Sequence, residues 1–157
     1  MAVEFSPEAL KRFEEIISRY PKKEAAMLPV LYLAQAEFGY LGTDAIEYVA
    51  KSMGVSTARV YGVVTFYTML NMKPIGTHHI QVCRTLPCAL AGAEKIAALI
   101  KAKLGIDAGE TTPDGKFSLS EVECLASCGT GTMMQVNEDY YENLTEERVA
   151  EILQSLK

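Results

Sequence analysis

The sequence predicts an α+β protein with two domains, a four-helix bundle over residues 1–72 and an α/β domain over residues 73–157. In the first half, apolar residues recur at three- and four-residue spacing between helix-capping residues, which is typical of amphipathic helices. In the second half, short strand-like runs alternate with helical periodicity, which favours a sheet packed against helices. All four cysteines lie in this second half, so we expect the chemistry of the protein to reside there.

Four helices are expected in the first domain, each with a start signal and an apolar face. Ser6 caps the first, and Thr43 and Ser56 cap the third and fourth. The second covers roughly residues 23–38, although Pro29 requires either a later start or a kink. The side chains expected to face inward, helix by helix, are Leu10, Phe13, Ile17 and Tyr20, then Met27, Leu28, Leu31 and Ala34, then Ile46, Val49, Ala50 and Met53, then Val60, Val63, Val64 and Tyr67.

The second domain is predicted to alternate strands and helices. The expected elements are a strand over 79–82 that runs into Cys83, a helix over 89–104, a turn at 112–115, a strand over 117–123, a hairpin over 133–141 and a helix capped by Thr145. This β-α-β-β-α order, with one parallel crossover and one hairpin, is typical of an open sheet of thioredoxin-like type.

The cysteines follow the pattern C-x4-C, then 35 intervening residues, then C-x3-C. They are Cys83, Cys88, Cys124 and Cys128. Each pair follows a predicted strand at its C-terminal end, where ligands gather in open α/β sheets. If the two strands are neighbours, the four sulfurs converge on one site. Cys88 also lies near a helix N-terminus, which favours a thiolate.

Several groups could occupy such a set of thiols. Structural zinc sites favour C-x2-C spacing, which neither pair has. A 2Fe-2S cluster is larger, with two cysteines on each iron, and suits longer loops. The spacing therefore favours a 2Fe-2S cluster over zinc, with a dithiol or four buried thiols as the remaining alternative.

Composition excludes several classes of function. The net charge of −5, from 15 basic and 20 acidic residues, comes without a dense basic cluster, so we expect no nucleic-acid binding. The apolar stretches are too short for insertion in a membrane, and the N-terminal residues do not form a signal peptide, so we expect a cytoplasmic protein. A dinucleotide-binding fingerprint and nucleophile–base pairs are also absent from the sequence, so we expect no catalytic residue.

The sequence around the cysteines resembles the E-type subunit of bacterial NADH:quinone oxidoreductase (complex I), the 24-kilodalton-type 2Fe-2S subunit family. The matching segments in the second half are Val82–Cys88, Gly109–Phe117, Val122–Gly129 and Gln135–Asn137. The resemblance extends into the first half at Tyr20–Lys23, Phe38–Leu41 and Gly62–Tyr67.

The resemblance implies one 2Fe-2S cluster on a thioredoxin-like domain, with Cys83, Cys88, Cys124 and Cys128 as its ligands. It implies an electron-transfer subunit that exchanges single electrons with the FMN of a partner NADH-oxidising flavoprotein, the F-type subunit, in respiratory NADH:quinone oxidoreductase. FMN and NAD(H) are then expected on that partner, and this chain in the cytoplasmic peripheral arm of the membrane-bound complex. The alternatives are the equivalent small subunit of an NAD-dependent formate dehydrogenase or hydrogenase, and a free soluble electron carrier.

Two positions near Cys128 depart from the family pattern. Ala126 stands where the family usually has Gly, and Gly131-Thr132 stands where it usually has Ala-Pro. Both leave the cysteines intact but can change the N–H groups that bond to sulfur. Arg84, beside Cys83, is the expected cation that offsets the charge of the cluster, with a solvated loop cation as the alternative. A partner-docking patch is expected from Tyr61, Phe66, Tyr67, Met69 and Met72, with core packing as the alternative for the first three.

Overall fold

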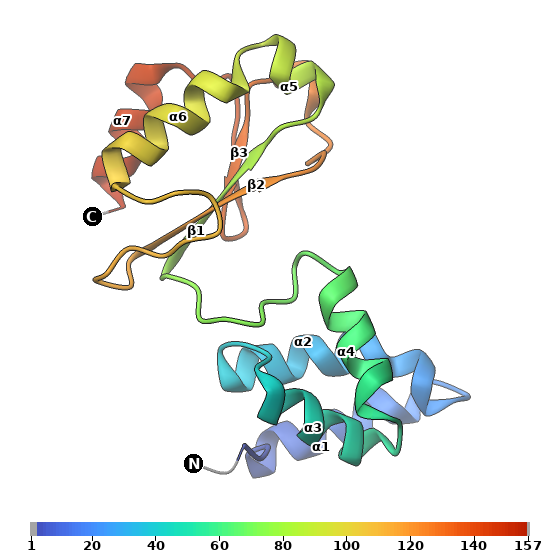
Figure 1. Cartoon of the computed structure of the whole chain (residues 1–157). Coiled ribbons are helices and arrows are strands. Elements are labelled where there is room, and N and C mark those ends of the chain that lie inside the picture. Colours follow the sequence, from blue (N-terminus) through green and yellow to red (C-terminus); the bar gives the residue numbers. More distant parts are fainter. Residues whose placement is uncertain (1–2, 157) are drawn as a thin grey trace. The chain divides into compact units, whose positions relative to one another are not determined.

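The computed structural model describes residues 3–156 and combines helices with a four-stranded sheet (Figure 1). The residues divide into two compact units, of which the first ends at Pro74 and the second begins at Ile75. Each unit buries its own hydrophobic core. The mixed helix and sheet content confirms the predicted fold class in its general form.

The first unit consists of helices joined by short connections. They are α1 (Pro7–Ser18), a 3-10 turn η1 (Lys23–Ala26), α2 (Met27–Phe38), α3 (Thr43–Met53) and α4 (Thr57–Phe66). The Ser6 hydroxyl accepts a hydrogen bond from the first turn of α1, as predicted. Because α2 begins at Met27, Pro29 lies in its first turn and requires no kink. The cap of α3 is Gly42 rather than Thr43, which is already helical, so that prediction was wrong.

The core of the first unit is aliphatic at its centre and aromatic at one side. Fully buried members include Val30, Leu31, Leu41, Ile46, Val49, Val60 and Val64. Phe5 stacks on Phe38 with ring centroids 5.4 Å apart. Leu10, which we expected to face inward, is 43% exposed. On α1 the buried Ala9 and the partly buried Phe13 form the packed stripe instead, and this places Leu10 at its edge.

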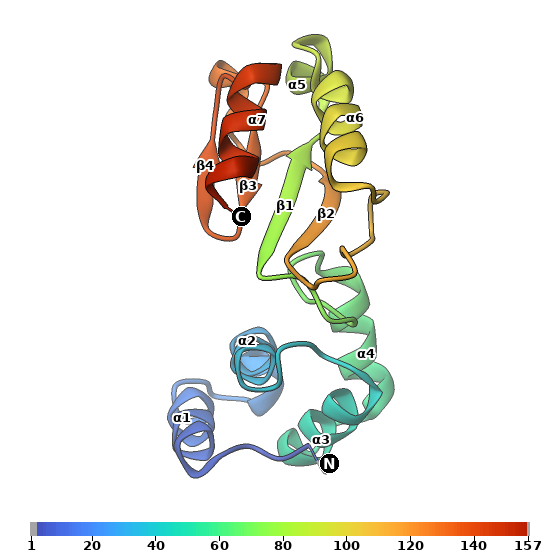
Figure 2. The ribbon, with the colours of Figure 1, turned by 90° about the vertical axis from the view of Figure 1, so that its left-hand side faces the viewer.

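The second unit is a mixed sheet with helices on one face. Its elements are β1 (His78–Cys83), α5 (Leu86–Leu90), α6 (Ala93–Leu104), β2 (Phe117–Val122), η2 (Cys128–Thr130), β3 (Met134–Val136), β4 (Asp139–Tyr141) and α7 (Glu146–Ser155). The strand order is β2-β1-β3-β4, and β1 is parallel to β2 but antiparallel to β3. Figures 1 and 2 show α6 and α7 on the same face of the sheet. This arrangement confirms the predicted crossover and hairpin.

The helix predicted over residues 89–104 is in fact two helices. The chain breaks between α5 and α6 at Gly92, whose φ of +97° lies in the left-handed region that interrupts a helix. In consequence Cys88 belongs to α5, a separate helix of five residues. The apolar periodicity continues through the break, which is why the sequence pattern did not reveal it.

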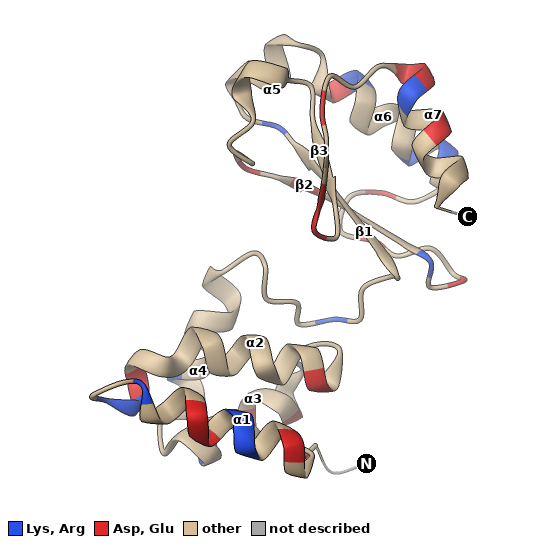
Figure 3. Cartoon of the chain, turned by 180° about the vertical axis from the view of Figure 1, so that it is seen from behind, with Lys and Arg blue, Asp and Glu red and all other residues tan. Residues whose placement is uncertain are grey.

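Charged side chains of both signs are interspersed on the helices. Figure 3 shows basic and acidic residues alternating along α1 and α7.

Among residues 3–156, no helix is long and apolar enough to cross a membrane.

Candidate metal centre

The parallel pairing of β1 and β2 brings the two cysteine segments to the same edge of the sheet. Cys83 is the last residue of β1 and lies opposite Val122, the last residue of β2. The Arg84 N–H donates to the Val122 carbonyl at 3.0 Å and extends this pairing by one step. Cys124 follows two residues after Val122. The prediction that the two strands are neighbours is therefore confirmed.

All four thiols are free, and they differ in their exposure to solvent. Cys83 and Cys88 are 2% and 1% exposed, whereas Cys124 and Cys128 are exposed. The sulfurs of Cys124 and Cys128 lie 3.9 Å apart. Leu125 packs against the buried group that contains Cys83 and Cys88, so the second cysteine segment meets the first. The site thus has a buried thiol pair and an exposed thiol pair.

The ionisation of the buried thiols differs from one to the other. Burial raises the pKa of Cys83, but hydrogen bonds from the Thr85 side chain and the Leu125 backbone outweigh it and lower the pKa overall. Burial raises the pKa of Cys88, and the neighbouring Cys83 thiol raises it further. Cys88 lies in the first turn of α5, as expected, but burial and the neighbouring Cys83 thiol outweigh the favourable effect of the helix N-terminus, so its pKa is raised overall.

Backbone hydrogen bonds reach the sulfurs of this site. The Ala126 N–H donates to Cys124 Sγ at 3.3 Å. Hydrogen bonds from the backbone at Leu125 and Met133 act to lower the pKa of Cys83 and Cys88, respectively. Such donors stabilise negative charge on thiolates and on a cluster that they ligate.

The two positions that depart from the family pattern both lie close to the cysteine sulfurs. Ala126 has a φ of +63°, in the left-handed region that glycine adopts without strain. A Cβ atom at Gly131 would lie 3.3 Å from Cys88 Sγ, so the glycine relieves a close contact with this sulfur. The peptide bond between Gly131 and Thr132 is cis.

Two side chains, Tyr140 on β4 and Glu142 directly after it, hold the second cysteine loop (residues 124–128) in place. The Tyr140 hydroxyl donates to the Leu125 carbonyl at 2.8 Å. The Glu142 carboxylate accepts hydrogen bonds from Ser127 and from Thr130, the latter at 2.6 Å. The Ser127 and Thr130 hydroxyls hold the pKa of Glu142 below its usual value. These contacts were missed because they join residues 12 to 15 positions apart through a hairpin, and no local pattern indicates them.

The donor set fits an iron–sulfur cluster in its chemistry. Thiolates are the usual ligands of such clusters, and the site supplies four of them in two pairs, with N–H donors around the sulfurs. Among residues 3–156, no three His, Cys, Asp or Glu side chains already surround the position of a single ion.

Comparison with known proteins gives the class of this protein. Residues 13–157 match the sequence model of the thioredoxin-like 2Fe-2S ferredoxins, and the chain belongs to this family. It is 46% identical over 156 residues to the E-type subunit of NADH-quinone oxidoreductase from Rickettsia conorii, covering 98% of this chain and 93% of that protein. By this similarity the chain belongs, within the family, with the E-type subunits of NADH-quinone oxidoreductase.

Two further proteins are similar to this chain, one in sequence and one in fold. The mitochondrial NADH dehydrogenase (ubiquinone) flavoprotein 2 of Dictyostelium discoideum is 42% identical over 157 residues, covering 98% of this chain and 64% of that protein. In fold, the chain is similar to a chain of an NAD+-reducing NiFe hydrogenase, with a TM-score of 0.72 and 15% identity. That alignment covers 83% of this chain and 22% of the hydrogenase chain, and it concerns the fold alone.

Proposed function

We propose that this chain is the 2Fe-2S electron-transfer subunit of a respiratory NADH:quinone oxidoreductase. Cys83, Cys88, Cys124 and Cys128 are the proposed ligands of one cluster. The observation that carries the proposal is the meeting of two thiol pairs at one edge of the sheet, with N–H donors at the sulfurs. Similarity to the rickettsial E-type subunits over nearly the whole chain supports the choice of complex.

When bound, the cluster would supply a site that accepts and donates one electron at a time. The residues of this chain give that site two different sides. Cys83 and Cys88 lie in an apolar group with Ala93 and Met133, which excludes water from one side. Cys124 and Cys128 lie at the surface, so the second side gives an electron the shorter path to a partner.

A partner protein is part of this proposal. NADH releases two electrons as a hydride, and a single 2Fe-2S cluster takes one, so a flavin must stand between them. The sequence of this chain has no dinucleotide-binding fingerprint, and we therefore assign FMN and NAD(H) to a partner flavoprotein, the F-type subunit of the complex. The proposed location of the pair is the cytoplasmic peripheral arm of the membrane-bound complex.

The helical domain, residues 1–72, is the proposed docking element, and we interpret its helices as a four-helix bundle. Its exposed apolar side chains support a role in docking, because Tyr61, Phe66 and Met69 are 51%, 76% and 45% exposed. Tyr67 and Met72, which belong to the same predicted patch, pack against the core instead. Phe66→Ser should weaken recovery of the partner flavoprotein without unfolding the chain, since this side chain contributes little to the core.

The cluster is tested by electron paramagnetic resonance of the purified chain after dithionite reduction, with iron and acid-labile sulfide counted on the same sample. A rhombic or axial S = 1/2 signal with about two irons and two sulfides per chain is expected. Cys88→Ser and Cys124→Ser should each reduce both counts, while Ser52→Ala, in the helical unit, should not. A colourless, silent protein that contains zinc would overturn the proposal.

The complex is tested by purifying the tagged chain from its own membranes and identifying what accompanies it. Recovery of an FMN-containing NADH-oxidising protein together with quinone-reducing activity is expected. Recovery of formate dehydrogenase or hydrogenase subunits would instead select the alternative assembly.

A further inference from the structure

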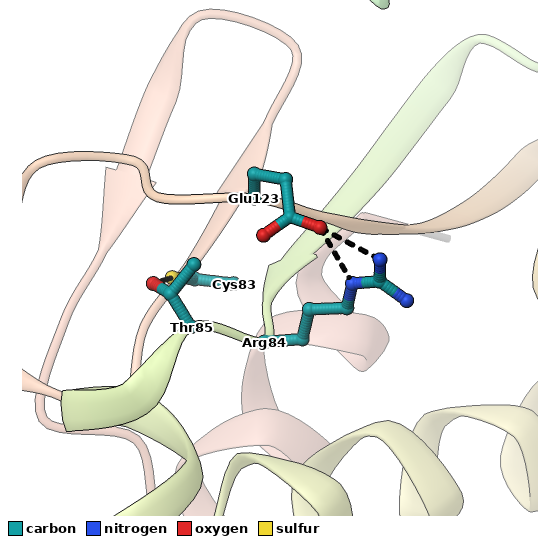
Figure 4. Close-up of polar contacts among 4 residues, drawn as sticks. All are labelled: Cys83, Arg84, Thr85 and Glu123. Carbon is teal, nitrogen blue, oxygen red and sulfur yellow. Dashed lines mark hydrogen bonds and ion pairs between the residues drawn. The ribbon is translucent and has the colours of Figure 1, made fainter.

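An ion pair joins the two segments that carry the cysteines. Arg84 Nε and Nη2 both donate to Glu123 Oε1, at 3.0 and 2.7 Å (Figure 4). Arg84 directly follows Cys83, and Glu123 directly precedes Cys124. The pair therefore spans the ends of β1 and β2 beside the first cysteine of each pair.

The stability of the fold does not explain this contact. The side chains of Arg84 and Glu123 are 61% and 69% exposed, and exposed ion pairs contribute little to folding. Figure 4 also shows the Arg84 side chain extending away from the sulfur of Cys83 and toward Glu123. Any effect of Arg84 on the site must then act through the carboxylate and through the local field.

The field matters because the proposed site is anionic. Two ferric ions, two sulfides and four thiolates sum to about −2, and reduction brings the total to about −3. An unpaired carboxylate next to Cys124 would oppose that added electron, whereas a carboxylate paired with a guanidinium is nearly neutral at a distance.

We propose that Arg84 is a positioning residue that neutralises the Glu123 carboxylate beside the cluster, so that the ion pair sets the reduction potential. This inference rests on the proposed function, since it requires the cluster. It makes the two partners opposite in effect: loss of Arg84 leaves a free anion and lowers the potential, and loss of Glu123 leaves a free cation and raises it.

A second ion pair, between α6 and β2, offers a matched control. Lys101 Nζ lies 2.7 Å from Glu121 Oε1, the same separation as in the Arg84 pair. Glu121 lies on β2, two residues before Glu123, and is correspondingly further from Cys124. Breaking this second ion pair should therefore change the potential less.

The test is a redox titration of the full cluster-loaded chain, followed by electron paramagnetic resonance, for Arg84→Gln, Glu123→Gln and the double variant. At a fixed ambient potential, each single change should alter the ratio of reduced to oxidised cluster by about 3- to 10-fold, in opposite directions, and less at high salt. The double variant and Arg84→Lys should both lie near the wild type. Lys101→Gln and Glu121→Gln should each cause a smaller shift.

If the ion pair only held the two cysteine segments together, the variants would behave differently. Both single variants would then lose iron and sulfide together, or move the potential in the same direction, and either result would overturn the inference. Equal shifts from the Lys101 pair would overturn it as well. A wild-type chain that binds no cluster would instead refute the proposed function, and the inference with it, so the two failures are distinguishable.

Discussion

Ala126 lies between Cys124 and Cys128 with a φ of +63°, and its side chain is exposed. A Cβ atom in the left-handed region meets its own backbone, and here it gains no packing in return. Ala126→Gly should therefore raise the free energy of unfolding by about 1 kcal/mol. Urea unfolding followed by far-ultraviolet circular dichroism measures the change.

Ala98 provides the control for this substitution. It is also exposed, but it lies within α6, where glycine is less favourable than alanine by about 0.5–1 kcal/mol. Ala98→Gly should thus lower the stability while Ala126→Gly raises it. A loss of stability in both variants would contradict the argument from φ.

His79 is the residue through which stability should depend on pH near neutrality. Burial lowers the pKa of His79 below its ordinary 6.5, and the ring lies 2.9 Å from the Ser120 hydroxyl. As the pH falls below 6.5, the unfolded chain takes up a proton that the folded chain resists, so protonation favours unfolding. The contribution is complete above 6.5 and is lost as the pH falls toward the folded pKa. His79→Gln, which retains a hydrogen-bonding side chain, should flatten the fall in melting temperature below 6.5; an unchanged slope would exclude His79 as its source.

At the scale of elements, two glycines have opposite consequences for stability. Gly62 lies within α4 and is exposed, with open space around its Cα, so Gly62→Ala should stabilise the helix by about 0.5–1 kcal/mol. A Cβ at Gly76 would lie 2.8 Å from backbone atoms of Lys116 and Phe117, so Gly76→Ala should destabilise the chain by about 1–3 kcal/mol. Urea unfolding of both variants tests the pair, and stabilisation by Gly76→Ala would show that the segment before β1 can move away from Lys116 and Phe117 at no cost.

Elements with strong local signals were predicted well. The capped helix α7 and the hairpin of β3 and β4 occur where the sequence indicates them. The break between α5 and α6 was not predicted, because a single glycine in a continuous apolar pattern also fits an unbroken helix. The orientation of Leu10 was wrong for a similar reason, since periodicity defines a broad face and only packing selects the buried stripe.

The sequence was enough to predict that the cysteines lie close together, but not which side chains hold their loops in place. The position of each cysteine pair after a predicted strand was enough to place Cys83 and Cys124 at one edge of the sheet, because neighbouring parallel strands end at the same edge. The supporting contacts of Tyr140 and Glu142 depend on how the hairpin folds back over the second cysteine loop. The partner of Arg84 likewise required the register of β1 and β2, which no local pattern contains.

At the scale of the whole molecule, the four cysteines and the proposed docking surface belong to separate units. The core of the first unit extends as far as Met72, and the cores of the second unit begin at Ile80. All four cysteines belong to the second unit. A ligand that binds only the folded second unit stabilises that unit by mass action and leaves the other unchanged unless the two unfold together.

Removal of the cluster should therefore loosen one unit only. After chelation of iron under reducing conditions, amide hydrogen exchange should accelerate at least about tenfold in β2 and in residues 124–133, because the bound state no longer opposes local opening. Exchange in α1 to α4 should change by less than about twofold, since their core residues and the cysteines belong to separate clusters. Mass spectrometry of peptides from the loaded and stripped chain compares the two units in one sample, and Cys124→Ser should reproduce the stripped pattern without a chelator. Equal acceleration in both units would show that the helices depend on the metal centre for their stability, and the proposed division between docking and electron transfer would then be wrong.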